Sequence, residues 1–520
     1  MKKLKVYLCL LCFFTPELYS QSPQEYVEPT LQVLREDRYK SLMQNMGWDS
    51  WVWPQNRLSL GMKGDKDLQS GFVVDGHVIV ETSYLFSTSW KQESKFPDDM
   101  EFLSLPMEGY IGEHAYGRFG LNIRKDPFAW KDQMSSQVNV PFSVGEMDFN
   151  FPFNSGFSFG GEGWNLQLAR GRLSFGPGSE GSLLLSPAVG AQDYILFHGY
   201  NDWFGIHLSW VNLDNCDIAR DIVTKLPLDP SPDFGYYPAS PDEFSGKSKF
   251  YGNHGLEFRY DKFFRFGIGE TFVFDTGQPD FKYLNPLLLF HNYFLNNSNS
   301  DLYMDAEWRP VPGHRLYGQF LMDYLKTWFK NDIYQDTRPG AFGYLAGYET
   351  VLLLGTGTVT LGFEGMYSDP FLYNDENQPM VGQRRVNSNY FGRQGETSAS
   401  RIIDFPLGWE EGPDTLTGKF TAAWRDPLIQ FLEFSYKLKG KGERTIRSAY
   451  QKGTAANSLV TPSGIAEWSH DSGLKSEVKI FPNLSLEASV HGVYILQKNH
   501  LMNNNAWDFY GSIGVKWDVK

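Results

Sequence analysis

The feature that most constrains this chain is the alternation of apolar and polar residues in segments about ten residues long. In the last segment the apolar set is Phe509, Ile513, Val515, Trp517 and Val519, and the polar set is Tyr510, Ser512, Lys516 and Asp518. Successive side chains of a strand point to opposite faces, so each such strand has one apolar and one polar face. The same split recurs at 474–480, 484–490 and 315–324. A soluble β-sandwich could also show it, with its polar face in water.

The connections between these segments decide between the two architectures, because tight turns alternate with long segments. The tight turns contain Asn201-Asp202, Asp261-Lys262, Val311-Pro312-Gly313, Gly355-Thr356-Gly357, Arg425-Asp426-Pro427 and Pro482-Asn483. The long segments fall near 176–190, 214–247, 275–300, 327–339, 369–412 and 439–463. Short turns on one rim and long loops on the other are typical of outer-membrane barrels. We predict about 18 strands, with 16 as the alternative because the region 125–147 has no clear strand pattern.

The start of the chain predicts export. Lys2, Lys3 and Lys5 precede an apolar run over 6–14, and a cleavage site follows near Ser20. No run of 18 apolar residues follows, whereas aromatic residues make up 16% of the chain and there are 51 glycines. We therefore predict an all-β chain that forms a transmembrane antiparallel outer-membrane β-barrel, located in the outer membrane of a diderm bacterium. Its parts are a signal peptide (1–20), a periplasmic N-terminal segment with a short helix (21–65) and the barrel (66–520).

The net charge and the cysteine content limit which partners and which covalent cross-links we expect. The formal net charge of −14 argues against nucleic acid as a partner. Cleavage of the signal would leave Cys216 alone, so no internal disulfide is expected. We expect a monomer embedded in outer-membrane lipid, with no cofactor and no metal. A periplasmic or export-machinery protein is a candidate partner.

The sequence contains no recognisable catalytic arrangement. The ten histidines are scattered, with no His-Glu-x-x-His pair for a metal, and no Gly-x-Ser-x-Gly nucleophile motif is present. A barrel could still assemble a serine and a histidine from different strands. We expect no enzymatic activity and name no catalytic residue.

The long loops carry aromatic residues beside hydrogen-bonding side chains, a combination that suits the faces and hydroxyl groups of sugars. The alternative is that these aromatics pack within the loops or belong to the interfacial girdle. The candidate binding residues are Tyr236, Tyr237, Tyr390, Phe391, Arg393 and Trp409.

Two features concern the faces of the wall. Arg170, Arg172 and Asp323 are expected to project into the lumen, where a charged network that closes the pore is favoured over a ligand site. In 264–274 the alternation would turn Glu270 toward lipid, which is costly at mid-depth. We predict a β-bulge at Gly267 or Gly269 that turns Glu270 inward, and a position near the outer rim is the alternative.

Several stretches, in order, resemble the Wzi family of capsule-assembly outer-membrane proteins. The first follows Arg170 and Arg172: a strand ends at Gly176-Pro177-Gly178, and 181–186 reads Gly-Ser-Leu-Leu-Leu-Ser. The later stretches are Asn285-Pro286-Leu287, the strand of Asp323, Leu361-Gly362-Phe363-Glu364 with Tyr367, Phe405-Pro406-Leu407-Gly408 and Gly412-Pro413-Asp414.

The resemblance implies a largely closed barrel of about 18 strands that binds exported capsular polysaccharide and holds it at the cell surface. It implies a lectin-like role without catalysis. The family also carries a periplasmic helical bundle, whereas this sequence shows one convincing helix. A porin or substrate-specific channel is the alternative function, and a barrel enzyme is the third. A channel requires an open lumen with a charged constriction, whereas a lectin-like barrel should be plugged.

Overall fold

The computed structural model describes residues 71–519, except 75, 88–100, 112–114, 126–135, 148–154, 162–163, 187–190, 202, 214–236, 240–247, 261–262, 277–297, 312, 325–338, 355–356, 374–384, 395–396, 426–430, 447 and 449–459. The predicted signal peptide and the predicted helical segment lie outside the described residues. The predicted barrel begins at 66, and its first described strand begins at Gly71. Within the described residues, no helix has the length and hydropathy to cross a membrane.

Almost all regular structure is β-strand. The strands of the first half are β1 (Gly71–Val74), β2 (His77–Ser87), β3 (Glu101–Ile111), β4 (Ala115–Arg124), β5 (Ser136–Val138), β6 (Ser155–Gly161), β7 (Trp164–Arg172), β8 (Ala191–Tyr200), β9 (Phe204–Leu213), β10 (Tyr237–Ala239), β11 (Ser248–Tyr260) and β12 (Phe264–Thr276). Those of the second half are β13 (Ser298–Trp308), β14 (His314–Tyr324), β15 (Ala341–Leu354), β16 (Gly357–Ser368), β17 (Arg385–Gln394), β18 (Thr397–Pro406), β19 (Thr415–Arg425), β20 (Phe431–Lys441), β21 (Glu467–Phe481), β22 (Leu484–Leu496) and β23 (Ala506–Val519). Two short 3-10 helices, η3 (Val144–Glu146) and η10 (Lys498–His500), complete the set.

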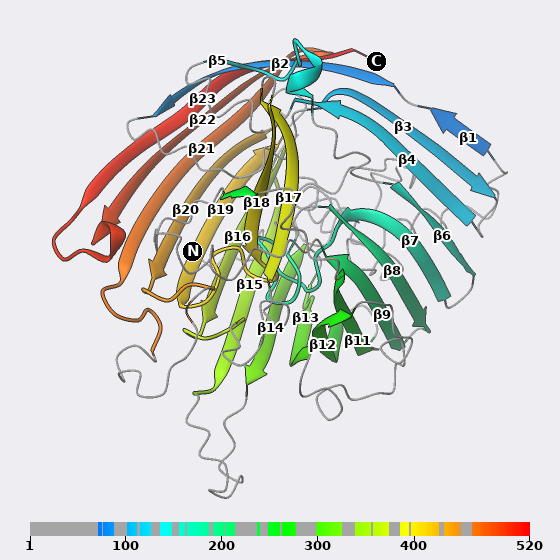
Figure 1. Ribbon diagram of the computed structural model, residues 1–520, viewed down its shortest axis with the longest axis vertical. Coiled ribbons are helices and arrows are strands. Elements are labelled where there is room, and N and C mark those ends of the chain that lie inside the picture. Colours follow the sequence, from blue (N-terminus) through cyan, green and yellow to red (C-terminus); the bar gives the residue numbers. More distant parts are fainter. Residues whose placement is uncertain are drawn as a thin grey trace, which may run out of the picture.

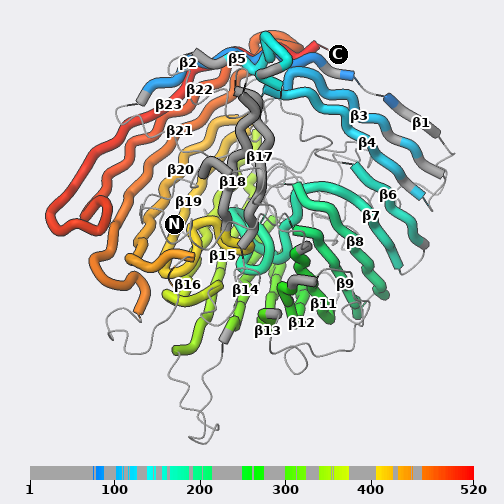
Figure 2. Tube along the Cα trace, in the orientation of Figure 1, coloured from blue at the N-terminus to red at the C-terminus, as the bar shows by residue number. Residues whose placement is uncertain are grey.

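The strands form a closed antiparallel barrel of 18 strands. Neighbours in the ring are neighbours in the chain, and the ring closes where β2 pairs with β23 from Val78↔Val519 to Ser87↔Tyr510. Figure 1 shows the first strands in blue beside the last in red, and Figure 2 follows the chain around the ring in sequence order. The 18-strand prediction is confirmed, and the alternative of 16 is excluded.

The region 125–147 contributes β5 and η3 rather than strands that run the length of the wall. β2 pairs with β3 at His77 and Val78, and further along β2 the same edge pairs with β5. In Figure 1, β5 lies beside β2 near the top of the view.

The two rims differ as predicted. Two or three residues separate β8 from β9, β11 from β12 and β21 from β22, whereas 214–247 separates β9 from β11 and 442–466 separates β20 from β21. We call these edges the short-turn rim and the long-loop rim. β10, β17 and β18, all from long loops, form a separate three-stranded sheet.

Alternation sorts the side chains into an outer and an inner face. The outer face is an apolar surface typical of a lipid-facing barrel. Its exposed residues include Leu256, Ile268, Leu302, Met304, Leu316, Phe363, Phe420, Phe434, Leu474, Ile513 and Trp517. Charged and polar side chains alternate with them on the inner face.

The predicted bulge at Glu270 is wrong. β12 pairs with β11 and β13 without a register shift through Gly267 and Gly269, so Glu270 stays on the outer face beside Leu302. Its carboxylate is buried and lies 3.3 Å from Nε2 of His254, its direct cross-strand partner. A neighbouring histidine, rather than a backbone irregularity, accommodates the carboxylate.

Candidate functional site in the barrel interior

A segment of the chain folds back into the barrel and fills part of its lumen. After β7, residues 173–186, which we call the plug segment, turn inward, although the sequence predicted a long loop at 176–190. The Phe175 amide donates to the Leu185 carbonyl (3.0 Å), which closes the segment on itself. Leu183, Leu184 and Leu185 are fully buried. Three consecutive leucines out of water supply roughly 1.5–3 kcal/mol each to holding it there.

Polar side chains of the inner wall hold the backbone of the plug segment. Gln319 on β14 accepts from the Leu183 amide (2.7 Å) and donates to the Phe175 carbonyl (3.1 Å). Glu364 on β16 accepts from the Ser179 amide (2.7 Å), and Arg315 donates to the Pro177 carbonyl. A loop has no ladder partners of its own, so these wall residues satisfy buried groups that would otherwise be costly.

The backbone of the plug segment lies so close to the wall side chains that its turn, Gly176-Pro177-Gly178, requires glycine. Gly176 has φ +133°, a conformation that L side chains rarely adopt. A Cβ at Gly176 would also collide with Nε2 of Gln319, the side chain that binds the plug.

Two further loop segments close over the plug. The Tyr373 hydroxyl donates to the Leu183 carbonyl (2.9 Å) and accepts from the Trp409 amide (3.1 Å). The Ser186 amide donates to the Leu407 carbonyl (2.8 Å), and the Tyr373 amide donates to Asp323 on β14 (3.0 Å). The described stretches of the family resemblance at 181–186, 405–408 and around Asp323 therefore meet in the packing of this plug, whereas Asn285-Pro286-Leu287 lies outside the described residues.

Asp414 connects these loops to the β20–β21 connection. Its carboxylate accepts from the Ser463 amide (2.9 Å) and the Arg444 amide (3.0 Å), and its own amide donates to the Asp369 carbonyl (3.1 Å). Burial raises the pKa of the Asp369 carboxyl, although hydrogen bonds from Tyr367 and the Phe342 amide act in the opposite direction.

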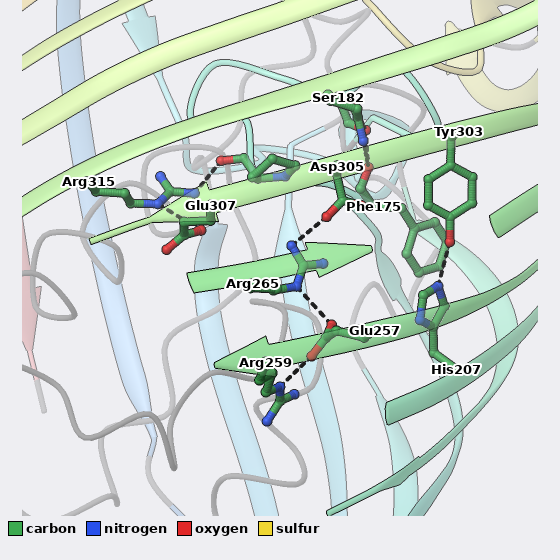
Figure 3. A network of polar contacts seen from close by, with 12 residues as sticks. Phe175, Ser182, His207, Glu257, Arg259, Arg265, Tyr303, Asp305, Glu307 and Arg315 are labelled. Carbon is green, nitrogen blue, oxygen red and sulfur yellow. Dashed lines mark hydrogen bonds and ion pairs between the residues drawn. The ribbon is translucent and has the colours of Figure 1, made fainter. Parts of the chain in front are cut away.

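Below the plug, toward the short-turn rim, the inner wall carries a ladder of ion pairs (Figure 3). Arg265 lies between Glu257 (2.8 Å) and Asp305 (2.6 Å), and Arg315 lies between Glu307 (3.0 Å) and Glu349 (2.7 Å). Arg259 and Arg309 extend the ladder to Glu257 and Glu307. Four arginines face four carboxylates across β11 to β15, so the buried charges balance. Such a balanced network is the arrangement under which burial of charge is tolerated.

A second polar contact crosses the wall next to the ladder. The Tyr303 hydroxyl lies 2.7 Å from Nε2 of His207 and donates to Asn253 (3.0 Å). A Cβ at Gly255 or Gly269 would collide with that hydroxyl. These strand glycines leave room for the Tyr303 ring to lie along the wall and reach β9 (Figure 3).

The opposite inner wall is solvated. The inner faces of β20 to β23, which we call the solvated wall, carry partly exposed polar side chains such as Lys437, Asp471 and His491, each about a quarter exposed. Lys475 also points inward and is exposed. The described interior is thus packed against β11 to β16 and open to solvent along β20 to β23.

The structure places the two predicted aromatic stretches in the same three-stranded sheet. Tyr237 begins β10, which pairs with β18, and β18 pairs with β17, where Tyr390, Phe391 and Arg393 lie. Ile402 of β18 is the register partner of both Tyr237 and Asn389. Tyr236 lies outside the described residues. The binding roles of these residues stay predictions.

Trp409, predicted with them, has a different place. Its ring packs in the interior cluster with Leu183 and is only 4% exposed, so it offers no face to an external ligand in this conformation. The Leu407 carbonyl two residues before it accepts from Ser186 of the plug, and its own amide donates to Tyr373, which explains why it is drawn inside.

Of the residues predicted to face the lumen, Asp323 does so and Arg170 does not, and Glu364 from the family resemblance also faces the lumen. Arg170 lies on the outer face, 2.8 Å from Asp193, its cross-strand partner, and both side chains are partly exposed. Arg172 is two residues further along, at the end of β7, so the alternation assigns it to the same outer face. The apolar residues Trp164, Leu166 and Leu168 of the same parity could have indicated this outward direction. Gly176, Pro177 and Gly178 form the tip of the plug.

The residues that sequence reasoning missed are the wall partners of the plug. Arg315, Gln319 and Asp323 were visible as the polar set of one strand, but nothing local to β14 shows what they bind. The same holds for Arg265 and Tyr303. No group of three or more His, Cys, Asp or Glu side chains that could hold a metal occurs among the described residues.

Comparison with known proteins yields structural likeness only, since no family model and no curated protein sequence matches the chain. A similar solved structure is Wzi from Escherichia coli, described as an outer membrane protein involved in group 1 capsule assembly and a carbohydrate-binding β-barrel (14% identity, TM-score 0.49, covering 93% of this chain and 97% of that one). OpdK from Pseudomonas aeruginosa, solved with vanillate, has 10% identity and a TM-score of 0.40, with 86% and 100% covered. OccK3 (OpdO) of the same organism has 10% identity and a TM-score of 0.39, with 86% and 95% covered. At this distance no residue role carries over.

Proposed function

We propose that this chain is a non-catalytic, lectin-like outer-membrane barrel of the Wzi kind. In this proposal it binds exported capsular or related polysaccharide and helps to attach it at the cell surface. The observation that carries the proposal is the plug segment. A barrel whose wall residues are engaged by its own chain is suited to hold a polymer at its mouth rather than to pass solutes.

The small sheet of β10, β17 and β18 gives further support. It brings the aromatic stretches of two loops that are far apart in sequence into one platform of backbone. Aromatic rings beside hydrogen-bonding groups suit the binding of sugar rings.

The test is glycan retention on intact cells that carry the protein, lack it, or carry it with Tyr237→Ala and Tyr390→Ala. We expect its loss to move surface polysaccharide into the medium while the total amount stays unchanged, and the double variant to release part of it. Unchanged retention in cells that lack the protein would refute attachment.

A channel is the second candidate, and the solvated wall favours it. Partly exposed charges of both signs along β20 to β23 resemble the lining of a selective pore. Planar-bilayer conductance of the purified protein separates the two functions, since a channel predicts stable ion-conducting openings and a closed lectin-like barrel predicts none.

A further inference from the structure

The solvated wall contains a built cluster of side chains that neither the plug nor the ion-pair ladder uses. His491 on β22 and Tyr510 on β23 are register partners, and their rings stack at 4.7 Å between centroids with an interplanar angle of 4°. Asp471 on β21 lies beside them, with Oδ1 2.9 Å from Nδ1 of His491 and Oδ2 3.4 Å from the Tyr510 hydroxyl.

The direction of these side chains follows from strand parity. Phe509, Ile513 and Leu474, their neighbours of opposite parity, are exposed on the apolar outer face. Asp471, His491 and Tyr510 therefore point into the lumen. The side chains of His491 and Asp471 are 26% and 27% exposed, so solvent reaches them.

The local sequence makes room for this arrangement. Gly473 is the direct cross-strand partner of His491 on β21, and a Cβ at that position would lie 2.6 Å from Cε1 of the imidazole. The absence of a side chain there lets the ring lie along the wall, where it stacks on Tyr510.

The chemistry of the cluster fits a hydroxylated ring. Stacked aromatic faces bind the C–H face of a sugar, and a carboxylate accepts hydrogen bonds from its hydroxyls. With Nδ1 bonded to Asp471, the other ring nitrogen of His491, Nε2, can bond a further hydroxyl of the sugar. Ser489 and Ser512, whose hydroxyls lie 2.8 Å apart, continue the polar surface by one step toward the short-turn rim.

We propose that Asp471, His491 and Tyr510 form a saccharide-binding subsite inside the barrel. It holds a sugar residue of the bound polysaccharide against the solvated wall. The inference rests on the proposed function and extends it from the loops into the lumen, on the side that the plug segment leaves open.

The test uses the full-length protein purified in detergent micelles, with surface polysaccharide isolated from the host cells as the probe. His491 is modified with diethyl pyrocarbonate, with and without polysaccharide, and read by mass spectrometry in the tryptic peptide 480–498, where it is the only histidine. His470, which bonds to Tyr436 on the outer face, is the internal control. We expect polysaccharide to lower the modification of His491 several-fold and to leave that of His470 unchanged.

Affinity supplies the second readout. Asp471→Asn keeps the size of the side chain and removes its charge, and we expect it to weaken polysaccharide binding by about tenfold, the effect of losing a charged hydrogen-bond acceptor. The matched control is Glu487→Gln, which removes a carboxylate of the same inward parity on β22, outside the cluster and closer to the short-turn rim. This control should retain most of the affinity.

The outcomes separate the two proposals. If the wild type binds polysaccharide, but His491 is not protected and Asp471→Asn binds as tightly, the subsite is refuted while attachment at the loops stands. If the wild type neither binds polysaccharide nor retains it on cells, both proposals fall.

Discussion

At the scale of the residue, the interior is organised by side chains that bind two partners at once. Arg265 lies between Glu257 and Asp305, and all three side chains are almost completely buried. Gln319 uses both ends of its amide on the plug segment. The partners of Arg265 come from two strands and those of Gln319 from two positions of the plug segment, so the loss of either side chain leaves more than one buried polar group without that partner.

Arg265→Met tests the ladder. Removing the guanidinium leaves two buried carboxylates without their shared cation, so we expect a loss of about 3–5 kcal/mol in the free energy of unfolding. The measurement is the urea midpoint in detergent micelles, followed by tryptophan fluorescence. Arg170→Met is the matched control, because the Arg170–Asp193 pair joins the same two kinds of group but is partly exposed, and should cost about 0–1 kcal/mol. Equal effects of the two variants would contradict the assignment of the ladder.

Gly176→Ala tests the tip of the plug. The substitution adds a Cβ at φ +133° that would collide with Gln319, so we expect a loss of about 1–3 kcal/mol from backbone strain and displaced contacts. Gly418→Ala is the control, since a Cβ at Gly418 meets nothing within 4 Å. A stability of Gly176→Ala equal to that of the control would show that the plug does not make this contact.

At the scale of the element, the wall is interrupted where β2 leaves β3. β5 pairs with β2 at Thr82 to Tyr84, and Asn139 continues this contact. Its side chain accepts from the Glu81 amide (2.9 Å) and donates to the carbonyls of Ile79 (2.8 Å) and Glu101 (2.9 Å). The fully buried side-chain amide of Asn139 thereby connects β2 and β3 where the two strands no longer pair directly.

Asn139→Ala should loosen this joint. Three backbone groups lose their partner, so we expect faster amide hydrogen exchange in β2 and β3 and a loss of roughly 2–4 kcal/mol in stability. Exchange is read by mass spectrometry of peptides from 77–87 and 101–111. Asn504→Ala, whose side-chain contact is exposed, should leave both peptides unchanged. Unaltered exchange in the Asn139 variant would mean that β5 holds the joint without it.

At the scale of the whole molecule, the plug segment and the solvated wall divide the interior. Barrels of 16–18 strands leave an aqueous channel unless chain segments fill it. Among the described residues, the plug segment anchored to β14 and β16 and the loop segments that close over it fill one side, and the opposite side stays accessible to solvent. We therefore expect the conductance of the barrel to depend on how firmly the plug segment is held.

Replacement of the plug segment, residues 173–186, by a Gly-Ser sequence of equal length should produce stable ion-conducting openings in planar bilayers that the closed wild-type barrel lacks. The physical reason is that the replacement cannot supply the leucines or the defined backbone that the wall residues bind. The same replacement of 498–504, in the β22–β23 connection, is the control. A wild type that already conducts as strongly as the plug variant would show that the plug does not obstruct the lumen.

The sequence by itself determined the barrel. Alternation, tight turns on one rim and long loops on the other are local properties, and a lipid-facing wall imposes them on every strand. This is why the strand number, the loop asymmetry and the inward direction of Arg315, Gln319 and Asp323 could be read from the chain. Even the outward direction of Arg170 was present in the parity of β7.

Only the tertiary structure decided which inward side chains meet. The plug looked like one more long loop, because the residues that hold it, Gln319 and Glu364, lie more than a hundred positions away. Glu270 is accommodated by His254 on a neighbouring strand, and Trp409 is drawn into the interior by the same plug. Alternation assigns each residue to a face, but it does not say what lies across the lumen, since that depends on contacts that form only when the ring closes.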